Sequence, residues 1–168
     1  MPARKKSTKQ GVTLVKQGAK FGLVGISNTL IDFTIFNVVT NVLHVPVEKD
    51  FIVKFFSGSV AMINSFYWNR TWTFKSKAGL GESGVKFLTA TLVSVYAIQP
   101  GMVWLFTHGA GYNFGEFWFH LFDVIGLVGL APNTLTDQFV VKNVAFGMGV
   151  IGSAVWNFTL YKLWAFKK

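Results

Sequence analysis

The sequence contains no cysteine, and only 14% of its 168 residues are charged. The absence of cysteine excludes disulfide bonds, catalysis by a thiolate and metal sites built on thiolates. A soluble domain of this length carries about 25% charged residues. The shortage of charge, together with 51% hydrophobic and 17% aromatic residues, indicates that much of the chain faces lipid. The three histidines are scattered along the sequence, so we expect neither a metal site nor a cofactor.

Four stretches are long and apolar enough to cross a bilayer, which takes about 20 residues each. They are residues 21–43, 51–69, 87–107 and 139–161. In the long connection between the third and fourth stretches, apolar residues recur at helical spacing from Phe114 to Ile125. This spacing predicts an amphipathic helix in the outer membrane interface. The predicted fold is an all-α integral membrane protein with four transmembrane helices and one interfacial helix.

The basic residues are distributed unevenly between the two sides of these spans. Thirteen of the sixteen Lys and Arg residues lie in the N-terminal segment, in the connection after the second span and at the C-terminal end. Because cytoplasmic segments are rich in Lys and Arg, we expect both termini in the cytoplasm. The net charge of +9 then reflects topology and contact with anionic membrane lipids, so we do not expect nucleic-acid binding.

Two segments of the sequence resemble each other. Residues 51–75 and 139–167 both begin with Phe-x-Val-Lys, and both end with a basic residue followed by x-Trp-x-Phe-Lys. The equivalent pairs at these ends are Arg70 with Lys162 and Trp72 with Trp164. Two hairpins of equal orientation form a parallel repeat, related by an axis along the membrane normal.

The domain organisation follows from this repeat. We expect a basic cytoplasmic tail over residues 1–17 and a four-span membrane domain over residues 18–168. Within that domain the two hairpin repeats cover about residues 18–77 and 84–168.

Three sequence segments together resemble the GtrA-like family of small four-helix membrane proteins. They are FGLVGISNTLIDFTIFNVV at 21–39, NSFYWNRTWTF at 64–74 and NFTLYKLWAF at 157–166. The resemblance extends over about residues 18–168. It implies a protein that moves polyprenyl-phosphate-linked sugars across the cytoplasmic membrane, or helps to present them, for the decoration of envelope polymers.

A lipid-linked sugar phosphate needs a cation near the membrane surface. Arg70 can hold a phosphate with its planar guanidinium group, with Asn69 beside it and Trp72 at headgroup depth. Lys162 and Trp164 are the counterparts in the second repeat. The alternative is that these basic and Trp residues flank a cytoplasmic helix end, as in many membrane proteins.

Asp32 is the only acidic residue inside an expected span, and ionisable residues there are costly and usually functional. It shares one side of its helix with Asn28, and the two suit sugar hydroxyl groups. We expect Asp32 to pair with Lys54 or Lys142, to carry a coupling proton, or to form a structural hydrogen bond between helices. Lys54 and Lys142 lie near the outer ends of their spans, where they either receive the phosphate after crossing or extend to the surface.

Patterns typical of enzymes are weak in this sequence. Gly147-x-Gly149-x-x-Gly152 has the spacing of a dinucleotide loop, but it lies inside an apolar span with no strand before it. We therefore attribute it to close helix packing. No Ser/His/Asp set, pair of catalytic carboxylates or phosphate loop is found, and we expect no catalytic residues and no enzyme activity.

These observations predict a multi-pass protein of the inner (cytoplasmic) membrane. Its expected function is translocation of a polyprenyl-phosphate-linked monosaccharide for glycosylation of cell-envelope polysaccharide. Since four helices enclose little room for a polar headgroup, we expect a homo-oligomer. Two alternatives remain: a non-transporting scaffold that anchors a membrane glycosyltransferase, and a small proton-coupled exporter.

Overall fold

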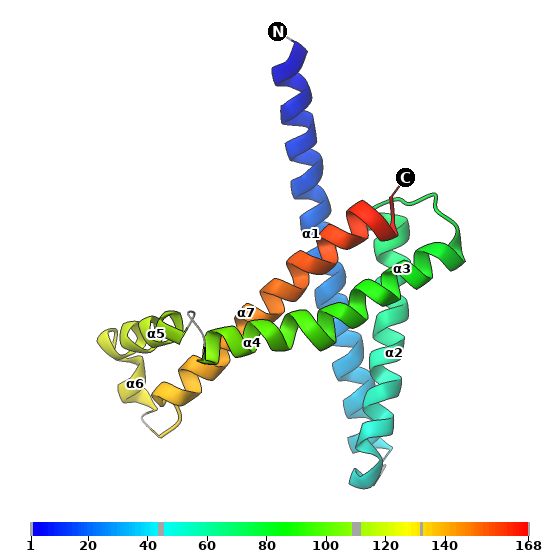
Figure 1. Ribbon diagram of the computed structural model, residues 1–168. Helices are drawn as coiled ribbons and strands as arrows, with labels where there is room; N and C mark the ends of the chain where they lie inside the picture. Colours follow the sequence, from blue (N-terminus) through cyan, green and yellow to red (C-terminus); the bar gives the residue numbers. More distant parts are fainter. Residues whose placement is uncertain (1, 44–45, 109–111, 132, 168) are drawn as a thin grey trace. The chain divides into compact units, whose positions relative to one another are not determined.

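The protein is helical, apart from short connections, over the residues that its computed structural model describes, 2–43, 46–108, 112–131 and 133–167 (Figure 1). In this part of the chain three helices are long and apolar enough to cross a membrane. They are Gly11–Val42, Leu80–His108 and Asp137–Ala165. The expectation of an all-α fold with helices able to span a membrane is therefore confirmed.

Several of the long helices contain a five-residue π-helical turn. The elements of the first half are α1 (Pro2–Asn37), η1 (Val38–Val42), η2 (Val47–Lys49), α2 (Asp50–Trp68) and η3 (Asn69–Thr73). Those of the second half are α3 (Leu80–Val93), η4 (Ser94–Ile98), α4 (Gln99–His108), α5 (Tyr112–Val124), α6 (Leu127–Leu130), α7 (Asp137–Leu160) and η5 (Tyr161–Ala165). In this set η2 is a short 3-10 turn, whereas η1, η3, η4 and η5 are π-helical.

Each of the four expected spans lies within helix, except that Leu43, the last residue of the first span, lies just beyond η1. The second expected span coincides with α2, which is not one of these three helices. The segment expected to form the outer helix is α5. Four spans, the parallel repeat and the interfacial position of α5 remain predictions.

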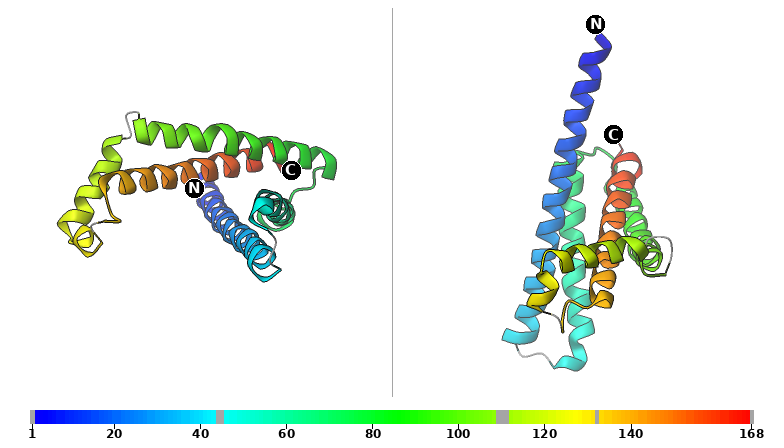
Figure 2. Two further views of the ribbon diagram at one scale, coloured as in Figure 1. Left: turned by 90° about the horizontal axis from the view of Figure 1, so that it is seen from below. Right: turned by 90° about the vertical axis from the view of Figure 1, so that its left-hand side faces the viewer.

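The described residues form two compact units. The first contains the residues up to Phe87 together with those from Tyr161 onward, and the second is Leu88–Leu160. In the first unit α1 and α2 lie side by side as an antiparallel hairpin (Figures 1 and 2). Small and branched residues of both helices are buried, among them Val24, Val53 and Ala61.

An aromatic cluster forms the core of the first unit near η3. Phe74 stacks on Phe166 with ring centroids 5.6 Å apart, and Phe87 lies 4.7 Å from Tyr161. Phe66 of α2 contacts both Phe87 and Phe166. This cluster holds the end of the first hairpin against the C-terminal segment.

In the second unit α7 packs against α4 and α5. A Cβ atom at Gly149 would lie 3.0 Å from Val103 Cγ2 and 3.1 Å from the Gln99 carbonyl oxygen, both of α4. One at Gly152 would lie 2.9 Å from Met102 Cγ. These two glycines let the helices approach closely, so the helix-packing interpretation is confirmed for Gly149 and Gly152. At Gly147 nothing lies within 4 Å of an added Cβ atom.

Candidate functional site

A set of polar side chains joins α1 to α2 along their shared interface. We call this set the interhelical polar row, and it consists of Ser27, Asn28 and Asp32 of α1 with Lys54, Ser57 and Asn64 of α2. In the row, Asn64 donates through Nδ2 to Asn28 Oδ1 at 2.8 Å and lies 3.4 Å from Ser27 Oγ. The row thus places amide, hydroxyl and charged groups inside a predominantly apolar hairpin.

Asp32 is the charged centre of this row. Its carboxylate accepts a hydrogen bond from Ser57 Oγ at 2.6 Å and forms an ion pair with Lys54. Of the two partners that the sequence allowed, Lys54 and Lys142, the structure therefore pairs Asp32 with Lys54. Ser57 is fully buried, whereas 25% of the Asp32 side chain and 59% of the Lys54 side chain are exposed. The carboxylate is held in the interface while the ammonium group reaches its edge.

The row covers a substantial part of the hairpin's length. From Asn64 to Lys54 an α-helix rises by about 15 Å at 1.5 Å per residue. This is about half of the 30 Å hydrocarbon thickness of a bilayer. A polar group moving along α2 would therefore meet hydrogen-bonding partners over about half of a membrane crossing.

Arg70 organises the chain just after α2. Its guanidinium group donates to the carbonyl oxygen of Ala78 and, through Nε at 3.3 Å, to Ser83 Oγ. Ser83 is fully buried. Arg70 therefore fixes the connection between η3 and α3, and it retains further N–H donors for an anion.

The side chain of Asn69 is buried, with 1% of the residue exposed. Its Nδ2 donates to Ser65 Oγ at 3.2 Å, whereas its Oδ1 has no hydrogen-bond partner within the described part of the chain. Thr73 Oγ1, one turn further on, is likewise buried without a partner there. Buried polar atoms without partners are rare and costly, so this end of the hairpin holds unused hydrogen-bonding capacity.

Each of the two motif tryptophans has a lysine beside it. The Lys20 ammonium group lies 4.8 Å from the centroid of the Trp72 ring, and that of Lys86 lies 5.9 Å from the Trp164 ring. Sequence reasoning did not identify these lysines as partners of the tryptophans. The available signal was the Lys-Phe pair that opens the first helix of each repeat, at 20–21 and 86–87.

The remaining candidate cations lie elsewhere. Lys162 is half-buried in η5, and Lys142 is exposed on α7. Lys142 belongs to the second unit, whereas the interhelical polar row belongs to the first.

A second polar cluster, which sequence reasoning also missed, lies within the second unit. Asn157 Nδ2 of α7 donates to Ser94 Oγ at 3.1 Å, and Ser153 Oγ donates to the Ser94 carbonyl oxygen at 3.5 Å. Asn157 Oδ1 is buried and has no partner in the described residues. Asn157 thus joins two helices, as Asn64 does in the first hairpin.

The two copies of the basic–Trp motif share a backbone conformation. η3 begins at Asn69 and η5 at Tyr161, so each π-helical turn begins one residue before the basic residue of its motif. π-Helical turns are rare and occur frequently at functional sites. The turns η1 and η4 are π-helical as well and lie outside this motif, and the internal repeat remains a prediction.

These features define a class: an all-helical membrane protein with an ion pair inside an apolar helical hairpin. The family model "GtrA/DPMS, transmembrane domain" matches residues 20–166, and the chain belongs to this GtrA-like family. It is also 37% identical over 84 residues to the "Uncharacterized membrane protein YngA" of Bacillus subtilis. That match covers 48% of this chain and 52% of the relative, so it spans about half of the relative's length. No solved structure matches significantly.

Proposed function

We propose that the protein translocates a polyprenyl-phosphate-linked monosaccharide from the cytoplasmic to the outer leaflet of the inner membrane. The sugar then serves the glycosylation of cell-envelope polysaccharide. Membership of the GtrA/DPMS family supports a role in this chemistry. The observation that carries the proposal is the interhelical polar row. Hydrocarbon offers no hydrogen bonds to a polar headgroup, and the row offers them along one hairpin.

Each part of the substrate has candidate partners. The phosphate is held at the cytoplasmic end by Arg70, with Lys162 as its counterpart in the repeat and Trp72 and Trp164 at headgroup depth. The sugar hydroxyl groups meet Asn28, Asp32 and Asn69. Lys54 and Lys142 receive the phosphate on the outer side. The free donors of Arg70 and the unpartnered Oδ1 of Asn69 support these roles.

The proposed topology has four spans in two parallel hairpin repeats, with both termini in the cytoplasm. The basic tail of residues 1–17 then lies against anionic lipid, and α5 lies in the outer interface. The common π-helical turn in η3 and η5 supports the repeat. Because one chain encloses little polar volume, we propose that it acts as a homo-oligomer, without catalysis and without a cofactor.

The scaffold function is the second candidate. The contacts of the polar row are also those that hold two helices together in a membrane. A hairpin fixed in this way is a suitable anchor for a membrane glycosyltransferase.

Purified protein in liposomes that contain a polyprenyl-phosphate sugar tests translocation. A membrane-impermeant reagent reports the fraction of sugar in the external leaflet over time. We expect fast equilibration with the wild type, and slowing by about tenfold or more, about 1.4 kcal/mol in activation free energy, in Asp32→Asn and in Arg70→Ala. Thr34→Ala is the matched control, because Thr34 lies on the same helix with its side chain exposed.

Two other results would contradict the proposal. Folded wild-type protein that equilibrates no faster than empty liposomes excludes translocation and favours the scaffold. Uptake of a drug-like cation driven by a pH gradient, lost in Asp32→Asn but kept in Arg70→Ala, would identify an exporter.

A further inference from the structure

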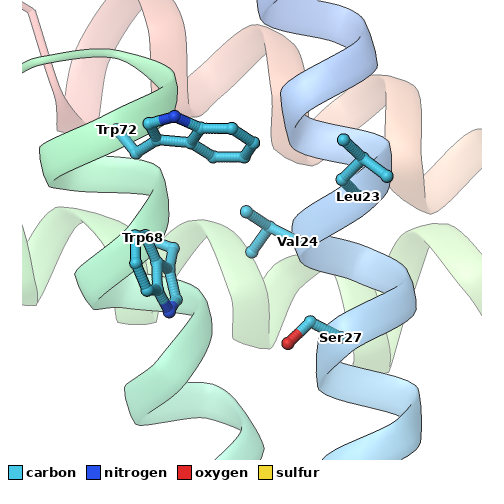
Figure 3. A pocket seen from close by; sticks show the side chains of 5 residues that line it. All are labelled: Leu23, Val24, Ser27, Trp68 and Trp72. Atoms are coloured by element: carbon cyan, nitrogen blue, oxygen red, sulfur yellow. The ribbon is translucent and has the colours of Figure 1, made fainter.

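A mostly apolar pocket lies between α1 and the η3 end of α2. Its volume is about 250 Å³, and it is lined by Leu23, Val24, Ser27, Trp68 and Trp72 (Figure 3). Figure 3 shows the two indole rings on one side and the three α1 side chains on the other. Leu23 and Trp68 are 56% and 43% exposed, so the pocket is open to the hairpin's surroundings. In a membrane these surroundings include lipid chains.

A positive charge lies at one end of this pocket. Lys20 precedes Leu23 by about one helical turn, and its ammonium group lies 4.8 Å from the centroid of the Trp72 ring. The same group donates to the Trp72 carbonyl oxygen at 3.4 Å, and it retains further N–H donors. No acidic residue precedes Asp32 in the sequence, and Lys20 forms no ion pair within the described residues.

The corresponding lysine of the second repeat differs in this respect. Lys86 lies beside Trp164 as Lys20 lies beside Trp72, but Lys86 is ion-paired with Glu82. Its charge is therefore partly neutralised within its own helix. Lys20 keeps its positive charge available at the apolar pocket.

We propose that this pocket binds the phosphate-proximal isoprene units of a polyprenyl phosphate and that Lys20 binds the phosphate. The inference rests on the proposed function, which supplies the isoprenyl phosphate as the ligand. An ammonium group beside an apolar pocket is complementary to an amphiphile that carries one anionic group at the end of an apolar chain. A cavity of about 150 Å³ accommodates benzene. A pocket of 250 Å³ therefore takes on the order of ten carbon atoms, or about two isoprene units.

This site adds a cation to the one that sequence reasoning identified. Two donor groups of Arg70 are engaged by Ala78 and Ser83. Lys20 uses one of its donors, on a backbone carbonyl group. Lys20 therefore offers N–H donors to the phosphate in addition to those that Arg70 retains.

Binding of two short probes to the full-length protein in nanodiscs tests the charge. The probes are farnesyl phosphate and farnesol, which share a chain and differ in the phosphate. We expect the wild type to bind farnesyl phosphate at least about tenfold more tightly. Lys20→Met should remove this preference and Lys20→Arg should keep it. Lys16→Met is the matched control, because it removes an exposed lysine one turn earlier on the same helix.

A second pair of variants tests the pocket itself. Leu23→Trp places an indole ring in the pocket and should weaken the binding of both probes by about tenfold. Leu30→Trp makes the same change at a similarly exposed position on the same helix that does not line the pocket. It should leave the binding of both probes unchanged.

Three results would overturn the site. They are a phosphate preference that survives Lys20→Met, equal binding in Leu23→Trp and Leu30→Trp, and displacement of farnesyl phosphate by phosphatidylglycerol as effectively as by unlabelled farnesyl phosphate. The last would indicate a general site for anionic lipid. The liposome assay separates the two proposals. If farnesyl phosphate binds as expected but the protein does not translocate lipid-linked sugar, only the proposed function is contradicted. If the protein translocates the sugar but does not show this binding, only the proposed pocket site is contradicted.

Discussion

The ammonium group of Lys54 on α2 pairs with the carboxylate of Asp32 on α1. Among the described residues, this ion pair joins the two helices of the first hairpin. Ser57 supplies a second hydrogen bond to the same carboxylate. Inside a membrane an unpaired charge costs about 2.5–3.5 kcal/mol. The pair therefore lets two ionisable side chains remain in a predominantly apolar hairpin.

Removing one member of the pair should destabilise the protein. Lys54→Met and Asp32→Asn should each lower the free energy of unfolding by about 2 kcal/mol, because each leaves one polar or charged group without its partner. The double variant should recover most of this loss. Unfolding in mixed detergent micelles measures all three variants. Lys142→Met is the control, since Lys142 is exposed on α7. Additive losses in the double variant would show that the two residues are not coupled.

The same double variant separates helix packing from transport. If Asp32 and Lys54 only hold α1 against α2, the refolded double variant should equilibrate a lipid-linked sugar as fast as the wild type. The proposed function predicts a folded protein that translocates at least about tenfold more slowly. Thermal unfolding and the liposome assay on one preparation decide between the two.

The helices could be predicted from hydropathy because long apolar runs favour helix in lipid. Apart from Leu43 at the end of the first, all four expected spans lie in helix. The choice between Lys54 and Lys142 as the partner of Asp32 was left open, since it depends on how the helices are placed side by side.

The contacts that Arg70 and Lys20 make within the chain could not be predicted from the sequence, for a physical reason. One acceptor of Arg70 is a backbone carbonyl group, and backbone groups carry no residue-specific signal. The contact between Lys20 and Trp72 joins residues far apart in the chain, so it depends on the register of α1 against α2. The π-helical turns were also not predicted, because their sequences do not differ visibly from those of ordinary helix.

Arg70 should be required for an ordered connection between η3 and α3. Arg70→Lys keeps the charge but cannot reproduce the planar geometry that reaches both Ala78 and Ser83. We expect a loss of about 1–3 kcal/mol in local stability and faster cleavage by trypsin after Lys75 and Lys77. Ser83→Ala should have a smaller effect, since one of the two contacts remains. Equal cleavage rates in wild type and Arg70→Lys would show that Arg70 does not restrain the connection.

Among the described residues, Lys75 is the one non-glycine residue whose φ angle is positive, at 51°. Left-handed backbone costs an L-residue about 1–2 kcal/mol, and glycine avoids this cost. Lys75→Gly should therefore raise the free energy of unfolding, by up to about 1 kcal/mol. Lys75→Gln controls for the lost charge and should give no gain. Lys77→Gly controls for added flexibility, and an equal gain there would contradict the explanation.

Gly149 and Gly147 lie one turn or less apart on α7, yet alanine should act in opposite directions at the two positions. At Gly149 the new Cβ would lie 3.0 Å from Val103 Cγ2 and 3.1 Å from a backbone oxygen of Gln99, whereas at Gly147 nothing lies within 4 Å. Gly149→Ala should cost about 1–3 kcal/mol through overpacking of α4 against α7. Gly147→Ala should stabilise by up to about 1 kcal/mol through helix propensity. Unfolding in micelles measures both, and a gain at Gly149 would mean that α4 and α7 do not pack at this distance.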